Sequence, residues 1–280
     1  MRIHHYIKNL LVFAALACSG QMMDREKFLI CVIGFFSFSL LSSSIYIIND
    51  IRDLENDKRH PAKCHRPLAS GAVSKQGAII LAVLCFTGSM FLNSLVFNPG
   101  STALLLLYFV LNLSYSFGLK NVPILDITIL VSGFLIRILY GAFLTGITVS
   151  DWLYLTVITI SFYFALGKRR NELRQTGEKN TRKVLASYSE GFLDRSMTMC
   201  ITLANVFYAL WTLDEKTQLL YKSRYLVFTV PLVLLITMKY SMDVEEKTSG
   251  GDPVEVLLHD PLLICFVVLY LAVLFANLYF

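Results

Sequence analysis

The chain has 280 residues and a formal net charge of +5, and only 16% of its residues are charged. A soluble domain carries about 25% charged residues, and the mean hydropathy here is +0.60. The apolar residues also come in long blocks rather than in periodic stripes. This composition excludes a disordered chain and a water-soluble globule, and it indicates a polytopic membrane protein.

We expect nine membrane-spanning helices in one all-α domain over residues 1–280. A span requires about 20 apolar residues. The candidates are Asn9–Met23, Phe28–Ile48, Gly77–Phe97, Thr102–Leu119, Val122–Leu144, Trp152–Gly167, Met197–Leu213, Tyr225–Tyr240 and Leu262–Phe280. The basic start and apolar middle of Met1–Met23 also resemble a signal peptide. Eight apolar segments follow it instead of a secreted domain, which favours a span.

The distribution of Lys and Arg between the connecting segments predicts the orientation of the chain in the membrane. With the N-terminus in the cytoplasm, 19 of these residues fall on the cytoplasmic side and five on the external side. Two long polar segments, Asp50–Gln76 and Lys168–Arg195, are then cytoplasmic, and the C-terminus is external. We therefore expect a multi-pass protein of the cell membrane (inner or plasma membrane).

An acidic cluster follows the second span, at Asn49-Asp50-x-x-Asp53-x-x-x-Asp57. If the helix continues past the membrane, this spacing places the three carboxylates on one face. Like charges on one face repel each other and favour a cation, and hard oxygen ligands suit Mg²⁺. The alternative is a solvated helix end whose counter-charges are the basic residues Arg52, Lys58 and Arg59.

Basic residues follow the acidic cluster directly, namely Lys58, Arg59, Lys63 and Arg66. Carboxylates that hold a metal, beside Lys and Arg that bind phosphate oxygens, are typical of a diphosphate site. The same pattern is compatible with a transporter loop or a lipid-headgroup anchor. A transporter would also show spans broken by Gly or Pro in matching halves, and this sequence shows none.

The two motifs of this region resemble those of the UbiA superfamily of intramembrane transferases. The acidic cluster matches the NDxxDxxxD motif of that family, and Arg66-Pro67-Leu68-Ala69-Ser70-Gly71 matches the RPLxxG that follows it. The resemblance implies a UbiA-like bundle whose active-site cavity faces the cytoplasm. It also implies that Mg²⁺ is bound by Asn49, Asp50, Asp53 and Asp57, of which the three aspartates are the expected catalytic residues.

The second polar segment departs from the usual family pattern. Typical members carry a second aspartate-rich motif there, which holds a second Mg²⁺, whereas this chain has Gly167-Lys168-Arg169-Arg170-Asn171-Glu172. This departure resembles one branch, the decaprenyl-phosphate phosphoribosyltransferases. Their reaction moves 5-phosphoribose from phosphoribosyl pyrophosphate (PRPP) to a polyprenyl phosphate and releases diphosphate, toward lipid-linked arabinose precursors of cell-envelope glycans.

The substrates implied by this resemblance are multiply anionic, so the site needs cations to hold them. The acceptor is a phosphate monoester that is already anionic, so positioning matters more than a strong general base. The residues expected to bind substrate are Lys8, Arg66, Tyr115, Lys120, Arg137, Lys168, Arg169 and Glu172. The expected partners are PRPP, a polyprenyl phosphate and the lipid bilayer, with no nucleic acid, and the sequence leaves a homo-oligomer open.

Alternatives remain for the function and for single residues. The second candidate function is a UbiA-type prenyltransferase that moves a prenyl group from a prenyl diphosphate to an aromatic or other small acceptor. Arg137 lies inside a span, eleven residues after Asp126 and on nearly the same helix face, so these two could pair helices without touching substrate. Lys120 could extend to the membrane interface, and Tyr115 could be an interfacial aromatic residue.

The predicted orientation can be tested with reporter fusions. A reporter within Lys168–Arg195 is expected to be active only in its cytoplasmic form, and one fused after Phe280 only in its external form. The measurement is the activity of paired reporters, one functional in the cytoplasm and one outside. The opposite pair of signals would contradict the orientation and would place the acidic cluster on the wrong side for cytosolic PRPP.

Overall fold

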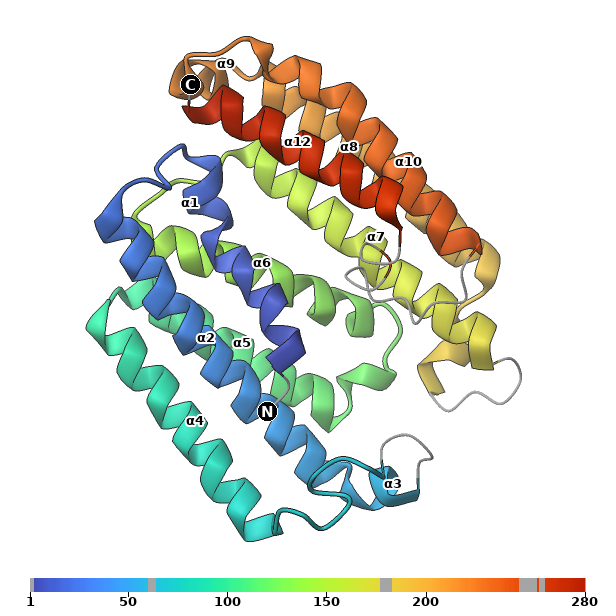
Figure 1. The fold of residues 1–280 in the computed structure, drawn as a ribbon. Helices are drawn as coiled ribbons and strands as arrows, with labels where there is room; N and C mark the ends of the chain where they lie inside the picture. The colour runs from blue at the N-terminus through green and yellow to red at the C-terminus, as the bar shows by residue number, and fades with distance from the viewer. Residues whose placement is uncertain (1–2, 60–63, 177–182, 247–255, 257–259, 280) are drawn as a thin grey trace. The chain divides into compact units, whose positions relative to one another are not determined.

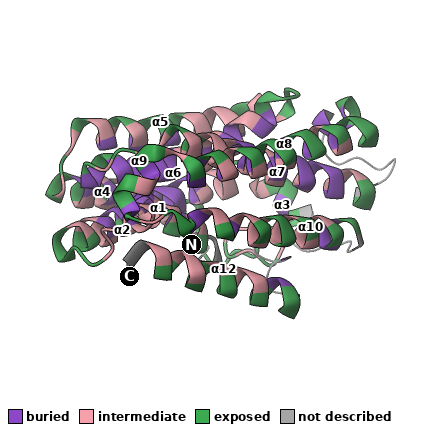
Figure 2. Cartoon of the chain, turned by 90° about the horizontal axis from the view of Figure 1, so that it is seen from above, coloured by how far each residue is buried: buried purple, intermediate pink, exposed green. Residues whose placement is uncertain are grey.

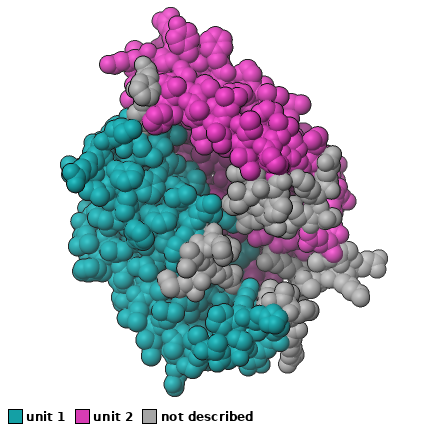
Figure 3. All heavy atoms as spheres, viewed as in Figure 1, with its two compact units in different colours: residues 1–118, 136–148 teal, residues 119–135, 149–280 magenta. Residues whose placement is uncertain are grey.

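The structure is a computed structural model that describes residues 3–59, 64–176, 183–246, 256 and 260–279, and all regular elements in these ranges are helices (Figure 1). This confirms the predicted all-α class. The chain divides into two compact units, shown in separate colours in Figure 3. Unit 1 comprises residues 1–118 and 136–148, and unit 2 comprises residues 119–135 and 149–280. The single domain expected from the sequence stays a prediction.

Local sequence sets the starts of the helices in unit 1. Asp24, Ser74 and Asn98 each accept hydrogen bonds from backbone N–H groups in the first turn of the helix that follows. Such caps satisfy N–H groups that have no partner within the helix. The elements are η1 (Ile3–Phe13), α1 (Ala14–Cys18), α2 (Arg25–Arg52), α3 (Leu54–Arg59), α4 (Lys75–Leu95), α5 (Pro99–Phe117) and the second half of α6 (Leu125–Thr145).

Small residues allow the helices of unit 1 to approach one another closely. Helix α2 packs most extensively on α4, where Ser37 Oγ donates to Ser89 O at 2.9 Å and Ser44 Oγ donates to Ala82 O at 2.9 Å. A Cβ on Gly141 of α6 would lie only 1.9 Å from the carbonyl oxygen of Val12. Small residues and hydroxyl groups at helix contacts are typical of packing inside membranes.

Unit 2 is organised around helix α7, which packs along α8. Its core includes Val131 from the first half of α6, Tyr163 and Leu166 from α7, and Leu193 and Met197 from α8. The elements of the unit are η2 (Leu119–Asn121), the first half of α6, α7 (Asp151–Thr176), η3 (Lys183–Ser187), α8 (Glu190–Leu213), α9 (Glu215–Tyr221), η4 (Tyr225–Thr229), α10 (Val230–Glu246) and α12 (Pro261–Tyr279).

Many apolar side chains are exposed in both units, whereas several serines are buried, which is typical of a membrane protein. Figure 2 shows exposed and buried residues along the helices. Leu84 and Phe91 of α4 and Leu235 and Met238 of α10 are exposed, whereas five serines of α2 are buried. In water such exposed surfaces would aggregate, so they suit lipid. Within the described residues, six helices are long and apolar enough to cross a membrane: Arg25–Arg52, Lys75–Leu95, Pro99–Phe117, Leu125–Thr145, Glu190–Leu213 and Tyr225–Glu245.

Three of the nine predicted spans do not reach that length or hydropathy. The first apolar helix covers only Tyr6–Cys18, because a turn with Gly20 at a φ of 69° precedes the cap of α2. The last covers Pro261–Asn277, and residue 280 of its predicted range lies outside the described residues. Helix α7 contains the sixth predicted span and continues through Lys168 to Thr176, where a loop was expected. The number nine therefore stays a prediction.

Replacing Gly141 should destabilise unit 1. Gly141→Ala would place a methyl group 1.9 Å from a backbone oxygen, which cannot move aside as a flexible side chain can. Overpacking of this kind costs about 1–3 kcal/mol, and we expect a lower Tm in detergent solution. Gly88→Ala is the control, because its Cβ would meet only the end of the Leu40 side chain at 3.3 Å. Equal Tm values for the two variants would contradict the close contact.

Candidate active site

The acidic cluster lies where α2 passes into α3, and the helical path continues across the junction. Asp53 is the C-terminal cap of α2, and its N–H donates to Asn49 O at 2.9 Å. The N–H of Asp57, in α3, donates to Asp53 O at 2.8 Å. These bonds between residues four apart keep Asp50 and Asp57 at nearly helical spacing, so both can face the same side.

Arg66 joins the two outer carboxylates of the cluster. One guanidinium nitrogen, Nη1, lies 3.2 Å from Asp50 Oδ1 and 2.6 Å from Asp57 Oδ2. The side chain of Asp57 is nearly buried, at 5% exposure, whereas Asp50 and Arg66 retain 22% and 28%. The shared contact confirms that Asp50 and Asp57 lie on one face, and the same placement of Asp53 stays a prediction.

The RPLxxG motif forms a turn that presents Arg66 to these carboxylates. The N–H of Ser70 donates to Arg66 O at 2.8 Å, which closes the turn. Gly71 has a φ of 80°, and a Cβ there would meet nothing within 4 Å, so backbone conformation rather than space requires glycine. Leu68 packs on the apolar cluster that includes Ile47. The backbone bond therefore closes the turn, and Leu68 fixes the turn to the apolar cluster.

Helix α5 orients the amide of Asn49. The hydroxyl of Ser116 donates to Asn49 Oδ1, and the same hydroxyl lies 2.9 Å from Asn112 O. Ser116 is buried, while Asp53 and Tyr115 are half-buried. Sequence reasoning did not identify Ser116, and its only signal was its place next to Tyr115, an expected substrate contact.

Arg137 is buried in unit 1 among polar and aromatic partners. Its Nε donates to Asn9 Oδ1 at 2.8 Å, and its Nη2 donates to the hydroxyl of Tyr108 at 2.9 Å. The guanidinium carbon also lies 4.8 Å from the ring centre of Phe38 and 4.9 Å from that of Tyr108. Hydrogen bonds and ring faces both stabilise a desolvated guanidinium, so this cation is held within the fold.

In unit 2, Arg169 is fully buried between two carboxylates. Its Nε lies 2.6 Å from Asp126 Oδ2, and its Nη1 lies 2.7 Å from Glu172 Oε2. The side chains of Arg169 and Asp126 are both 0% exposed, and that of Glu172 is 23% exposed. Direct binding of substrate phosphate by Arg169 stays a prediction.

Tyr188 completes the same network. Its hydroxyl donates to Asp126 Oδ1 at 2.6 Å and accepts the N–H of Ile124 at 2.7 Å. Burial, followed by the hydrogen bond to Asp126, raises the pKa of Tyr188 to about 12, so the hydroxyl stays protonated. Ile124 has a φ of 69°, which strains a β-branched residue. Tyr188 thus holds a strained turn directly before α6.

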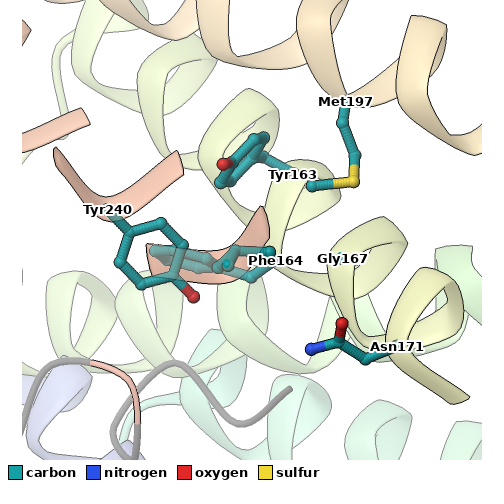
Figure 4. Close-up of a pocket in the computed structure, with 7 residues that line it drawn as sticks. Tyr163, Phe164, Gly167, Asn171, Met197 and Tyr240 are labelled. Carbon is teal, nitrogen blue, oxygen red and sulfur yellow. The ribbon is translucent and has the colours of Figure 1, made fainter. Parts of the chain in front are cut away.

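A small pocket lies beside the second polar segment in unit 2 (Figure 4). Tyr163 and Phe164 of α7 contact Tyr240 of α10, with ring centres 5.9 Å and 5.3 Å apart. The amide of Asn171 closes another side of the pocket, near Gly167. The lining combines these three aromatic residues, two of which carry hydroxyls, with the Asn171 amide and the apolar residues Met197 and Val244.

Further ion pairs hold the ends of the unit 2 helices. Arg170 pairs with Asp194 of α8. Lys239 Nζ lies 2.6 Å from Asp243 and 2.6 Å from Asp260, which joins α10 to the start of α12. The bond from Lys239, followed by the N–H of Leu263, lowers the pKa of Asp260 to about 2. Asp243 is thus part of a link between helices.

The structure agrees with the expectation that Asp126 and Arg137 join helices. Asp126 bonds to Arg169 and Tyr188, and Arg137 bonds to Asn9 and Tyr108. Sequence spacing along one helix could not reveal partners that come from α7 and from the segment before α8. The remaining predicted cations, Lys8 on η1, Lys120 on η2 and Lys168 on α7, are each half-buried.

The donor set of unit 1 fits a magnesium ion. Mg²⁺ is usually held by one or two carboxylates together with waters and substrate phosphates. Asp50 and Asp57 supply two converging carboxylates, and Asn49 supplies an oriented amide oxygen. Among the described residues, no group of three or more His, Cys, Asp or Glu side chains is arranged to enclose a metal. A site completed by phosphate oxygens agrees with both observations.

Long apolar helices, with carboxylate–arginine pairs in each of the two units, define a multi-pass membrane protein. The UbiA prenyltransferase family matches residues 10–249, and the chain belongs to this family. The resemblance expected from the two motifs is thus confirmed, and with it membership of a family of transferases.

Named relatives agree with the branch expected from the second polar segment. Decaprenyl-phosphate phosphoribosyltransferase of Mycolicibacterium smegmatis is 35% identical over 100% of this chain and 91% of its own length. The enzyme of the same name from Corynebacterium glutamicum is 35% identical over 94% of this chain and 80% of its own. A UbiA homolog from Archaeoglobus fulgidus, solved with DMAPP and Mg²⁺, has the same fold, with a TM-score of 0.71 at 16% identity over 99% and 96% of the two chains.

Removing the hydroxyl of Tyr188 should weaken unit 2. Tyr188→Phe deletes the donor to Asp126 and the acceptor of the Ile124 N–H, both in a buried network. Leaving such groups without a partner costs about 1–3 kcal/mol, so we expect a lower Tm. The control is Tyr154→Phe, which changes an exposed tyrosine of α7. An unchanged Tm for Tyr188→Phe would contradict the role of this hydroxyl.

Proposed function

We propose that this protein transfers the 5-phosphoribosyl group of PRPP to a polyprenyl phosphate and releases diphosphate. The observation that carries this proposal is the 35% identity, over the whole chain, to relatives named decaprenyl-phosphate phosphoribosyltransferase. The basic segment around Lys168 supports it, since a second aspartate-rich motif would be expected in a conventional prenyltransferase of this family.

The reaction breaks the bond between C1 of the ribose and the diphosphate oxygen. The electron pair leaves with diphosphate, and an oxygen of the polyprenyl phosphate forms the new bond to C1. Positive charge grows on the ribose ring and negative charge on the leaving group, so the site has to stabilise both. Mg²⁺ held by Asn49, Asp50, Asp53 and Asp57 would supply positive charge to the diphosphate.

The basic residues have a separate task, which is to bring two anions together. A phosphate monoester is already ionised near pH 7, so no strong general base is needed to activate it. We assign Lys168 and Arg66 to phosphate oxygens, with Lys8, Tyr115 and Lys120 as further substrate contacts. Arg137, Arg169 and Glu172 remain proposed site residues, and their buried bonds fit each of them to hold the shape of its own unit.

We also propose the complete membrane topology expected from the sequence, with nine spans, a cytoplasmic N-terminus and an external C-terminus. The six long apolar helices and two shorter ones support it. Helix α7 is the ninth candidate, with an apolar part at residues 152–167. This topology gives the acidic cluster access to cytosolic PRPP.

The assay is transfer of radiolabel from PRPP to a polyprenyl phosphate by the purified protein. Asp50→Ala and Asp53→Ala should each lower kcat by about 10²-fold or more, because loss of a charge-stabilising group has this magnitude. Glu55→Ala is the matched control, since Glu55 is an exposed carboxylate of α3 that pairs with Lys58. EDTA should abolish turnover of the unmodified protein.

Two results would contradict the proposal. The first is equal activity in EDTA and in Mg²⁺, which would show that the reaction needs no metal. The second is a protein that ignores PRPP but transfers a prenyl group from a prenyl diphosphate to an aromatic acid. That outcome would establish the alternative prenyltransferase function and leave the basic segment unexplained.

A further inference from the structure

The contact between Arg66 and the acidic cluster occupies the oxygens that a metal would need. A single nitrogen of Arg66 lies 3.2 Å from Asp50 Oδ1 and 2.6 Å from Asp57 Oδ2. Oxygens bound to Mg²⁺ lie about 2.0–2.1 Å from the ion. A metal bound to both of these oxygens would lie next to the guanidinium nitrogen, so the two cations would compete for the same carboxylates.

An arginine in this place differs from a neutral hydrogen-bond donor. Its guanidinium keeps its charge at all accessible pH values, so it neutralises repulsion between two carboxylates, one of which is only 5% exposed. The same planar group binds phosphate oxygens in a bidentate manner. Arg66 thus has two alternative acceptors of similar chemistry, the carboxylates that it contacts in this structure and the phosphate groups of a substrate.

The backbone around Arg66 favours an exchange by side-chain rotation alone. The turn is closed by the bond from Ser70 N–H to Arg66 O, at 2.8 Å, and Leu68 anchors it to an apolar cluster. The Arg66 side chain itself keeps 28% exposure. Its flexible chain can therefore change acceptors while the loop stays where it is.

We propose that Arg66 is the resident counter-ion of the acidic cluster and exchanges with Mg²⁺. Its contacts hold Asp50 and Asp57 together, and they oppose binding of metal alone. When metal arrives with diphosphate, the guanidinium moves from the carboxylates to phosphate oxygens. This inference rests on the proposed function only for the identity of the diphosphate substrate, and it makes metal and diphosphate bind with positive coupling.

The opposing possibility is that Arg66 does not move and that its contacts hold the metal site in shape. The two possibilities predict opposite changes in metal affinity when Arg66 is replaced. Loss of contacts that shape the site weakens the binding of metal alone, whereas loss of a competitor strengthens it. The sign of the change in metal affinity therefore decides between them without any measurement of catalysis.

The first experiment measures the affinity of the purified full-length protein for Mg²⁺ alone, by competition with Mn²⁺ followed by electron paramagnetic resonance. Arg66→Gln should bind the metal about tenfold tighter or more, since it removes charge-assisted bonds that metal otherwise has to break. Lys58→Gln is the matched control, because it deletes the same charge nearby, from an exposed side chain that pairs with Glu55. Its affinity should change less than twofold.

A second measurement uses the unmodified protein, so it does not depend on the folding of a variant. Arg66 is labelled with phenylglyoxal, and its peptide is quantified by mass spectrometry. Mg²⁺ alone should increase the labelling several-fold, because the guanidinium leaves the carboxylates. Inorganic pyrophosphate added with Mg²⁺ should protect Arg66 again.

Unchanged or weaker metal binding by Arg66→Gln would overturn the exchange, as would labelling that Mg²⁺ leaves unchanged or lowers. Neither measurement requires PRPP to be the substrate. If the metal and labelling responses appear but no phosphoribosyl transfer is found, the exchange stands and the proposed function fails. If transfer is found without these responses, the proposed function stands and the exchange fails.

Discussion

Every buried charge in an apolar bundle needs a partner, and this requirement shapes both units of the chain. Burying an unpaired ion costs several kcal/mol, and removing one partner of a buried pair is correspondingly destabilising. Arg169 meets the requirement with Asp126 and Glu172, and Arg137 meets it with an amide, a hydroxyl and two aromatic rings. The positions of these partners fix which helix faces turn inward.

The same requirement explains how the family's second acidic motif can be replaced without leaving excess charge in the fold. Arg169 is neutralised within unit 2 by Asp126, a residue far away in the sequence, and Glu172 adds a second acceptor. The basic substitution at this segment is therefore not simply a gain of positive charge. The positive charge of Arg169 is neutralised by its ion pairs with Asp126 and Glu172. Lys168, the neighbouring cation, is half-buried.

Sequence reasoning predicted the features that depend on composition and short spacing. The helical class, most of the apolar segments and the shared face of Asp50 and Asp57 follow from local patterns, since i to i+7 spacing is a property of one helix. Partners across the fold were not accessible in this way. Nothing near Asp126 indicates Arg169, and a hydroxyl such as that of Tyr188 carries no signal of its own. The end of α7 was missed because polar residues suggested a loop, although buried ion pairs stabilise it as helix.

The separation in sequence between Arg137 and its acceptors has a consequence for synthesis of the protein. Asn9 precedes Arg137 by 128 residues and Tyr108 precedes it by 29. At a rate of about 5–20 residues per second, Asn9 is made roughly 6–26 s before the arginine. The segments that carry both acceptors are thus synthesised before Arg137, so both hydrogen-bond partners exist when the arginine is added to the chain.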